Sequence, residues 1–227
     1  NFDESKAEQV AQMETDVDRF EDELGTYLVK LSSKQLSNKD SETLNTILHC
    51  IGDFERISDH ARNVKEAAQE MYDKKLDFSE KAQDELKVFE RAVHDILDIT
   101  MNSFINGDLN LARQVEPLEE VIDGLSLDVK QRHVRRLRKG KCTIELGFIL
   151  SDVITNFERV SDHCSNIAVC LVQVNEDEFD THAYLDELRQ EGNMDFQGKV
   201  RAYREKYQLP PTKQDRLAEK DAKLLAE

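Results

Sequence analysis

Two stretches of the chain decide the fold: IGDFERISDHARN at residues 51–63 and ITNFERVSDHCSN at residues 154–166. Eight of the thirteen aligned positions are identical, at an offset of 103 residues. A weaker match aligns ETDVDRFE at 14–21 with EEVIDGLS at 119–126, at an offset of 105 residues. Two offsets this similar indicate that one structural unit occurs twice in the chain.

The residues around these stretches are typical of long α-helices. The 227 residues include only 3 Pro and 8 Gly, so few positions interrupt a helix. We expect an all-α fold of two tandem three-helix bundles, six main helices in all, with a short helical C-terminal extension. The main helices are predicted over about 4–31, 41–74, 79–104, 117–138 and 142–174, with a weaker helical pair split near Gly192 and stopped by Pro210.

The repeat also predicts how the chain divides. The first three-helix repeat is assigned to residues 1–107 and the second to residues 108–209. Residues 210–227 are predicted to form a charged, mobile tail.

The composition excludes some classes of function. The formal net charge is −16, and such a surface repels a phosphate backbone, so no nucleic-acid binding is expected. The four cysteines form no Cys-x-x-Cys pair, so we expect reduced core residues. No apolar run approaches the ~18–20 residues of a membrane span, so the chain is expected to be soluble. Because it begins at Asn1 directly on a helical pattern, we expect it to be a piece of a longer protein.

Acidic residues recur at helical spacing within the repeated stretches. Residues four apart share one face of a helix, so Glu55 lies beside Asp59 and Glu158 beside Asp162. The preceding helix of each repeat carries a similar Glu and Asp. Packing two such helices together crowds four carboxylates, which repel each other unless a cation compensates. The predicted metal ligands are Glu14, Asp18, Glu55, Asp59, Glu119, Asp123, Glu158 and Asp162.

Carboxylate oxygens are hard ligands. They bind hard divalent or trivalent ions better than they bind soft, thiophilic metals. The expected ions are Fe, Mn, Zn or Mg. The residues predicted to support the ligands without binding metal themselves are Asn63, Asn166, Arg56 and Arg159. The alternative is that each Glu-x-x-x-Asp pair is ordinary solvated surface, with the arginines simply pairing with the acids. The repetition of the acids, the Arg, the Ser and the Asn in both copies favours a metal site.

No motif in the chain indicates catalysis. None of the six histidines has Glu three positions before it, which argues against a ferritin-like di-iron enzyme. There is no Gly-rich phosphate loop, no G-x-S-x-G elbow and no HExxH. We therefore expect no enzymatic activity, and a metal-dependent hydrolase is the least supported alternative. His60 and His163 lie about 100° around the helix from the adjacent Asp, so a bundle contact or an outer hydrogen bond is expected of them.

One basic run, RHVRRLRKGK at residues 132–141, interrupts the acidic sequence. Cations at the C-terminal end of a helix interact favourably with its dipole, and this explanation is sufficient by itself. The alternative is a contact with a partner, a phosphate or an anionic membrane surface.

The stretches FERISDHARNV and FERVSDHCSNI resemble the twin E-x-x-x-D helix motifs of PhoU-domain proteins. The Glu-x-x-(Val/Ile)-Asp pattern at 14–18 and 119–123 resembles the first-helix motif of that family. The resemblance covers about residues 5–175. It implies two three-helix bundles side by side, metal clusters held by these acids in some members, and a role in phosphate uptake through regulation of a transporter.

The C-terminal stretches THAYLDELRQEG and KVRAYREKYQL resemble PhoU domains attached to bacterial sodium/phosphate cotransporters. This resemblance implies a cytosolic regulatory domain at the inner face of the membrane. The alternatives are a free-standing PhoU-type negative regulator of phosphate ABC transport and signalling, and a helical scaffold without a ligand. The expected partners are a membrane transporter, in the same chain or separate, and a second copy in a homodimer. Ser126 stands where the first repeat has Glu21, so equal occupancy of the two metal sites stays open.

Overall fold

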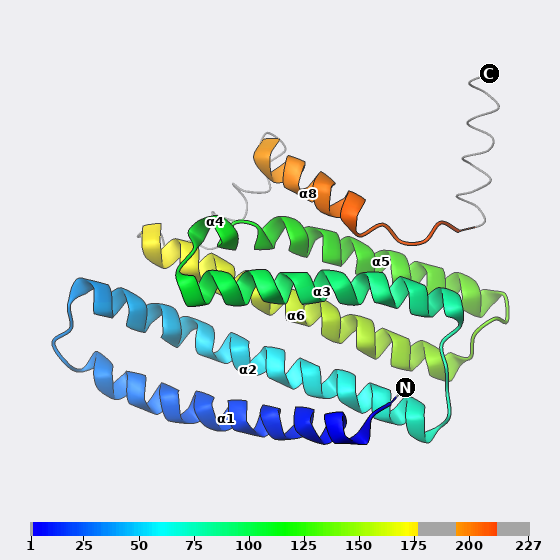
Figure 1. The fold of residues 1–227 in the computed structure, drawn as a ribbon, viewed down its shortest axis with the longest axis horizontal. Helices are drawn as coiled ribbons and strands as arrows, with labels where there is room; N and C mark the ends of the chain where they lie inside the picture. The colour runs from blue at the N-terminus through cyan, green and yellow to red at the C-terminus, as the bar shows by residue number, and fades with distance from the viewer. Residues whose placement is uncertain (1, 177–193, 213–227) are drawn as a thin grey trace.

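The computed structural model describes residues 2–176 and 194–212 (Figure 1). The predicted break near Gly192 and residues 213–227 of the predicted tail lie outside these ranges. The described residues form α1 (Glu4–Ser32), α2 (Asn38–Asp73), α3 (Glu80–Asn106), the single turn α4 (Leu109–Ala112), α5 (Val115–Arg138), α6 (Ile144–Glu176) and α8 (Met194–Lys206). The prediction of an all-helical protein is confirmed.

Local sequence signals explain where these helices begin and end. The Asp3 side chain accepts a hydrogen bond from the backbone N–H of Lys6, at 3.2 Å, and so caps the start of α1. The helix predicted over about 79–104 is confirmed as α3, and Gly107 ends it in the left-handed conformation, with a φ of 63° that suits a residue without a Cβ. Pro117 lies in the first turn of α5, as predicted, where its missing N–H costs nothing.

The helices pack in two parts that meet along α2 and α6 (Figure 1). α1 and α2 form an antiparallel hairpin, and α2 packs along the length of α6. α3 packs against α5 and α6 to form a three-helix bundle, and α8 lies against α5. Thus α3 follows the first motif-bearing pair in the sequence but makes its main contacts with the second pair. The predicted division of the chain at residues 107 and 209 stays a prediction.

The apolar pattern of α3 explains this packing. Phe89, Ala92 and Ile96 are fully buried at spacings of three and four residues, so they form one stripe of the helix. They belong to a core cluster that also contains Leu118 and Ile122 of α5. Within the described residues, this cluster lies in and between α3, α4, α5, α6, α8 and the turn after α8.

The α1–α2 hairpin is packed less densely. The buried residues of α1 are Ala7, Glu14 and Leu28. The large apolar side chains exposed along α1 are Met13, Phe20, Leu24, Tyr27 and Val29. The hairpin therefore depends on the α2–α6 contact for much of its burial.

The four cysteines form no disulfide in the structure. Cys50 and Cys164 are buried, whereas Cys142 and Cys170 are half-buried. Burial raises the pKa of the Cys164 thiol to about 12, which makes it a structural residue rather than a reactive one.

Candidate metal centres

The first group of acids lies between α1 and α2. Glu14 and Asp18 are one turn apart on α1, and Asp59 faces them from α2. One carboxylate oxygen from each of the three residues lies within 4.8 Å of the others. Glu14 is 4% exposed, Asp59 is half-buried and Asp18 is exposed, so the group opens to solvent on one side. Three of the four acids predicted for the first site are therefore brought together.

The second group repeats this arrangement between α5 and α6. Oxygen atoms of Glu119, Asp123 and Asp162 also lie within 4.8 Å of one another. Glu119 is 8% exposed, Asp162 is half-buried and Asp123 is exposed, the same gradient as in the first group. The two sets of three, which we call the carboxylate triads, are built from equivalent residues of the sequence repeat. Each triad thus contains three of the four acids predicted for its site and omits Glu55 or Glu158.

Glu55 lies beside the first triad without belonging to it. It lines a hollow of about 630 Å³ together with Asp18, Glu21 and Asp53. Burial raises the pKa of the Glu55 carboxyl, and the negative charges of Asp59 and Asp18 raise it further, against the opposing effect of Arg56. The ionised form of Glu55 is therefore disfavoured, and a cation in this hollow would relieve that cost.

Glu158, the equivalent of Glu55, already accepts hydrogen bonds from other side chains of the protein. Lys130 Nζ donates to Glu158 Oε2 at 2.9 Å, and the Ser126 hydroxyl donates to the same oxygen at 2.6 Å. Burial raises the pKa of Glu158, but these two hydrogen bonds and the lysine charge outweigh it, so the pKa lies below its usual value. The replacement of Glu21 by Ser126 therefore makes the two sites chemically different.

The predicted supporting arginines contact the acids. Arg56 Nη1 lies 3.1 Å from Asp59 Oδ2, and its Nε lies 3.4 Å from Glu55 Oε2. Arg159 Nη1 makes the equivalent contact with Asp162 Oδ2 at 3.0 Å. Both arginine side chains are 61% exposed, so these pairs are screened by water and contribute little to stability. Such arginines can swing away when a cation competes for the aspartates.

The predicted supporting asparagines lie elsewhere, at the crossing of α2 and α6. The Asn63 amide donates to Asn156 Oδ1 at 3.1 Å, and the Asn166 amide donates to Asp53 Oδ1 at 3.0 Å. Each therefore contacts the other repeat's helix rather than a triad carboxylate. Their role in metal binding stays a prediction.

The two motif histidines meet at the same crossing. The rings of His60 and His163 stack with their centroids 5.5 Å apart. Nδ1 of His60 lies 2.8 Å from Asn156 Oδ1, and Nδ1 of His163 lies 2.8 Å from Asp53 Oδ1. Residues 53 and 156 are separated by the repeat offset, as are residues 60 and 163, so the crossing has local two-fold pseudosymmetry. The expected bundle contact of the histidines is confirmed.

Sequence reasoning missed one residue at the first triad. Arg62 Nη1 donates to Glu14 Oε1 at 2.6 Å and compensates the most buried of the three acids. The equivalent residue of the second repeat is Ser165, so the comparison of repeats gave no signal for this contact. Arg62 is a competitor that a cation at the first triad would have to displace or tolerate.

The donor set of each triad fits a hard metal ion. It offers carboxylate oxygens alone, and two helices fix them close to one another. Glu14 and Glu119 are almost fully buried, and a buried carboxylate is costly unless it is paired or coordinated. Like charges at this separation repel, and a multivalent cation would relieve that repulsion in addition to the pairing that Arg62 gives Glu14.

Comparison with known proteins places the chain in a family. The model of the PhoU domain family matches residues 1–68 and 87–171, two blocks that each contain one carboxylate triad and that together span more than half of the chain. A PhoU homologue of Thermotoga maritima, a phosphate-specific transport system accessory protein, is 28% identical over 122 residues, which are 54% of this chain and 52% of the relative. The chain thus spans about half the length of that relative.

One further relative is similar in sequence, and two solved structures are similar in fold. A phosphate-specific transport system accessory protein PhoU homologue of Synechocystis sp. is 24% identical over 70% of both chains. The crystal structure of PhoU from Pseudomonas aeruginosa superposes with a TM-score of 0.71 at 20% identity, covering 77% of this chain and 83% of that one. PhoU from Streptococcus pneumoniae gives a TM-score of 0.66 at 18% identity, over 76% and 80% of the two chains. The chain belongs to the PhoU family.

Proposed function

We propose that this protein is a PhoU-type accessory regulator of phosphate transport that binds metal cations at its two carboxylate triads. The observation that supports metal binding most directly is the recurrence of one three-carboxylate arrangement at equivalent positions of both repeats. A single acidic cluster is commonly solvated surface. Two clusters with the same composition, the same burial gradient and the same helix pairing are better explained by a shared ligand.

The accessory role takes precedence over the transporter-domain role that the C-terminal sequence implied. Both curated relatives are accessory proteins of phosphate-specific transport systems. The stretch THAYLDELRQEG, which carries much of the resemblance to sodium/phosphate cotransporters, lies outside the described residues. None of the helices in residues 2–176 and 194–212 has the length and apolarity needed to span a bilayer.

The triads give such a regulator a structural means of responding to cations. Glu14 and Asp18 belong to α1 and Asp59 to α2, so a bound ion would tie these two helices together. Glu119, Asp123 and Asp162 would do the same for α5 and α6. When bound, the ion supplies positive charge, and the exposed Asp of each triad keeps that charge accessible to an anionic ligand or a partner.

A regulator of this kind requires a transporter as its partner. We propose that the partner is a phosphate transporter in the membrane and that this chain meets it at the cytoplasmic face. The role of this chain is regulatory rather than catalytic. The names of the two curated relatives support this partner class. A homodimer stays a prediction, and gel filtration with light scattering would test it.

The metal sites can be tested by thermal unfolding. A ligand that binds only the folded state adds about 2.7 kcal/mol at a hundredfold excess over its Kd, which corresponds to roughly 5–10 °C in Tm for a chain of this size. We expect Mn²⁺, Fe²⁺, Zn²⁺ or Mg²⁺ to raise the Tm of the chelator-treated protein. The double variant Asp59→Asn, Asp162→Asn should keep its helical circular dichroism and lose this gain.

A matched control removes the same charge outside the triads. Asp73 at the end of α2 and Asp128 on α5 are exposed and belong to neither triad. The variant Asp73→Asn, Asp128→Asn should retain the metal-dependent rise in Tm. An unchanged Tm of the native chain with all four metals, together with no bound metal after gentle purification, would contradict the proposal and leave the triads as solvated surface.

A further inference from the structure

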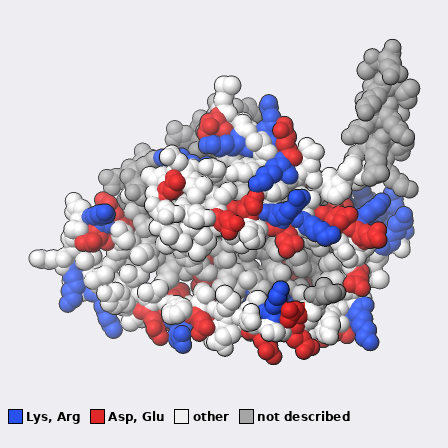
Figure 2. Space-filling view, viewed as in Figure 1, with Lys and Arg blue, Asp and Glu red and all other residues white. Residues whose placement is uncertain are grey.

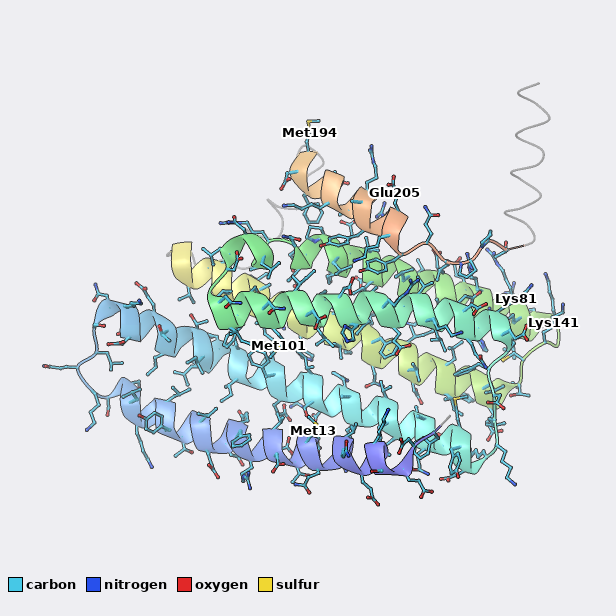
Figure 3. All side chains as sticks on the ribbon, viewed as in Figure 1. Met13, Lys81, Met101, Lys141, Met194 and Glu205 are labelled. Carbon is cyan, nitrogen blue, oxygen red and sulfur yellow. The ribbon has the colours of Figure 1, made fainter. Side chains whose placement is uncertain are left out.

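A second hollow lies at the end of the molecule where α3 begins and α5 ends. Its volume is about 600 Å³, and Pro210 and Pro211 form part of its wall. Figure 2 shows Lys and Arg side chains gathered at this end, and Figure 3 places Lys81 and Lys141 there. The six cations that line the hollow are Lys81, Arg132, Arg135, Arg136, Lys139 and Lys141.

Two arginines form the inner part of the hollow around one carboxylate. Arg136 Nη1 donates to Glu85 Oε2 at 2.6 Å, and Arg132 Nη1 lies 3.5 Å from Glu85 Oε1 and donates to the Pro210 carbonyl at 2.6 Å. The two arginine side chains are 16% or less exposed, so their charges are poorly solvated. Nη2 of Arg136 is buried and has no hydrogen-bond partner among the described residues. The inner wall thus carries two arginines beside one carboxylate, and Arg136 has an unused donor there.

The outer cations form no ion pairs in the part of the chain that the structure describes. Lys81, Arg135, Lys139 and Lys141 are exposed, and none forms an ion pair there. Besides Glu85, two acids line the hollow, Glu80 and Asp84, and the carboxylate of Asp84 lies 3.4 Å from Lys87. Among the described residues, six cations against three acids make the lining of this hollow positive, on a chain whose net charge is −16. A favourable interaction with the α5 dipole explains charge near a helix end, but it does not explain cations arranged around a hollow.

The start of α3 adds a further anion-binding feature. Ser79, the N-cap residue of this 27-residue helix, lines the hollow, and its side chain makes no capping hydrogen bond. The first backbone N–H groups of a helix lack partners within the helix and carry partial positive charge. Such a terminus combined with arginines is the arrangement that recognises phosphate groups.

We propose that this hollow binds a phosphate monoester, either a small organic phosphate or the headgroup of an anionic lipid. The volume falls within the range of small-molecule pockets, about 300–1,000 Å³, and exceeds what inorganic phosphate alone needs. The cations and the α3 terminus bind the phosphate, and the Pro210–Pro211 wall contacts the organic part. The proposal is independent of the carboxylate triads, which lie in other parts of the helix pairs.

Binding is measured by calorimetry on the chelator-treated full chain, so that no metal at the triads can hold phosphate. The probes are glycerol 3-phosphate, inorganic phosphate, and vesicles of phosphatidylcholine with and without phosphatidic acid. The triple variant Arg135→Gln, Lys139→Gln, Lys141→Gln should bind the preferred probe about tenfold more weakly, which is about 1.4 kcal/mol. Arg132 and Arg136 are left in place because their loss would leave the Glu85 charge buried without a partner.

Two further variants separate specific binding from general charge and from misfolding. Lys30→Gln, Lys34→Gln, Lys39→Gln removes three exposed cations at the opposite end of the molecule, at the turn between α1 and α2 (Figure 1), and should bind like the native chain. Ser79→Asp places a good helix cap and a negative charge at the hollow. It should maintain or raise the Tm while weakening binding, so a loss of binding cannot be attributed to unfolding.

The outcomes also identify the source of the phosphate. Tight binding of glycerol 3-phosphate indicates a soluble ester, whereas binding confined to vesicles with phosphatidic acid indicates a lipid headgroup. Both support the proposal if the triple variant and Ser79→Asp weaken the binding. Failure of the native chain to bind any ester probe, stronger binding of inorganic phosphate than of the ester, or equal weakening in the Lys30, Lys34 and Lys39 variant overturns it.

Discussion

The α1–α2 pair and the α5–α6 pair carry the same acids at the same spacing, yet they lie in different surroundings. α5 and α6 pack with α3 in the main core, where Leu118, Ile122 and Val129 are fully buried. α1 packs on α2 and leaves large side chains such as Phe20 and Tyr27 exposed within the described residues. Helical periodicity alone places the triad carboxylates on one face of each helix. The stability of each helix pair and the charges around each triad depend instead on the neighbouring helices.

The same contrast applies to the charges beside the triads. The pKa of Glu55 is raised by burial and by neighbouring acids, whereas Lys130 and Ser126 lower the pKa of Glu158. Within the described residues, Glu55 is paired with the exposed Arg56, whereas Glu158 is held by Lys130 and Ser126. Two copies of one motif have become two sites with different electrostatics.

The difference in packing should produce the largest effect. Leu118 of α5 and Leu28 of α1 are both buried, at 0% and 6% exposure. Leu→Ala changes in cores cost about 2–5 kcal/mol, and the cost grows with the cavity that remains. We expect about 4 kcal/mol for Leu118→Ala and about 2 kcal/mol for Leu28→Ala, because the exposed hairpin can close around the smaller side chain. Urea denaturation measures both, and equal costs would contradict the asymmetry.

A second effect concerns the affinity of each site for metal. Lys130→Gln releases Glu158 in the second site, and we expect metal to bind there about tenfold more tightly, since hydrogen bonds to charged groups contribute roughly 1.5–3 kcal/mol before screening. The reciprocal change uses Gly25, which aligns with Lys130. A Cβ at Gly25 meets no atom within 4 Å, so Gly25→Lys fits, and it should weaken metal binding at the first site.

These affinities are measured by metal titration in backgrounds where the other triad is disabled by Asp59→Asn or Asp162→Asn. If Lys130→Gln leaves the metal affinity of the second site unchanged while the first site still binds metal, the proposed electrostatic difference between the sites is wrong. If Gly25→Lys lowers the affinity of the first site to that of the native second site, the difference is explained by the lysine.

The smallest expected effect is the pH dependence of stability in the metal-free protein. It has opposite signs at the equivalent residues Glu158 and Glu55. The folded pKa of Glu158 lies below 4.5, so Glu158 contributes stability above pH 4.5 that is lost as the pH falls through the folded pKa. The folded pKa of Glu55 lies above 4.5, so its ionisation opposes folding at neutral pH, and this penalty fades as the pH falls towards 4.5.

At pH 7, Glu158→Gln should therefore lower the free energy of unfolding by about 0.5 kcal/mol, as expected for a partly exposed ion pair. Glu55→Gln should raise it by roughly 0.3 kcal/mol, the size of a relieved like-charge contact. Tm measured from pH 4 to pH 7 tests both, and a shift of the same sign in both variants would show that the two sites are equivalent.

Much of this structure could be predicted from the sequence because helices obey local rules. Gly107 and Pro117 mark helix ends through backbone chemistry, and the i, i+4 spacing places Glu14 beside Asp18 whatever the tertiary packing. The repeat then identified the facing aspartates, Asp59 and Asp162, without any structural information.

The remainder depended on contacts between distant parts of the chain. Periodicity shows that α3 has an apolar stripe, but it does not show which helices cover that stripe. The packing of α3 against α5 and α6 therefore could not be predicted. Lys130, which contacts Glu158, and Arg62, which contacts Glu14, each occur in one repeat only. A search for residues shared by the two repeats therefore cannot find them. Ser126 was a departure that the aligned repeats did reveal, and its hydroxyl donates a hydrogen bond to Glu158.

The stacked histidines at the α2–α6 crossing have a consequence for how the chain evolves. Two separate copies of one repeat would meet across a two-fold axis with identical residues on both sides, and any mutation near the axis would change both sides together. Here His163 faces Asp53, whereas His60 faces Asn156. Joining the repeats into one chain breaks that constraint, because each side of the axis then mutates alone. The contact thereby has a polarity, with a carboxylate against one histidine and an amide against the other, that a homodimer of a single repeat cannot have.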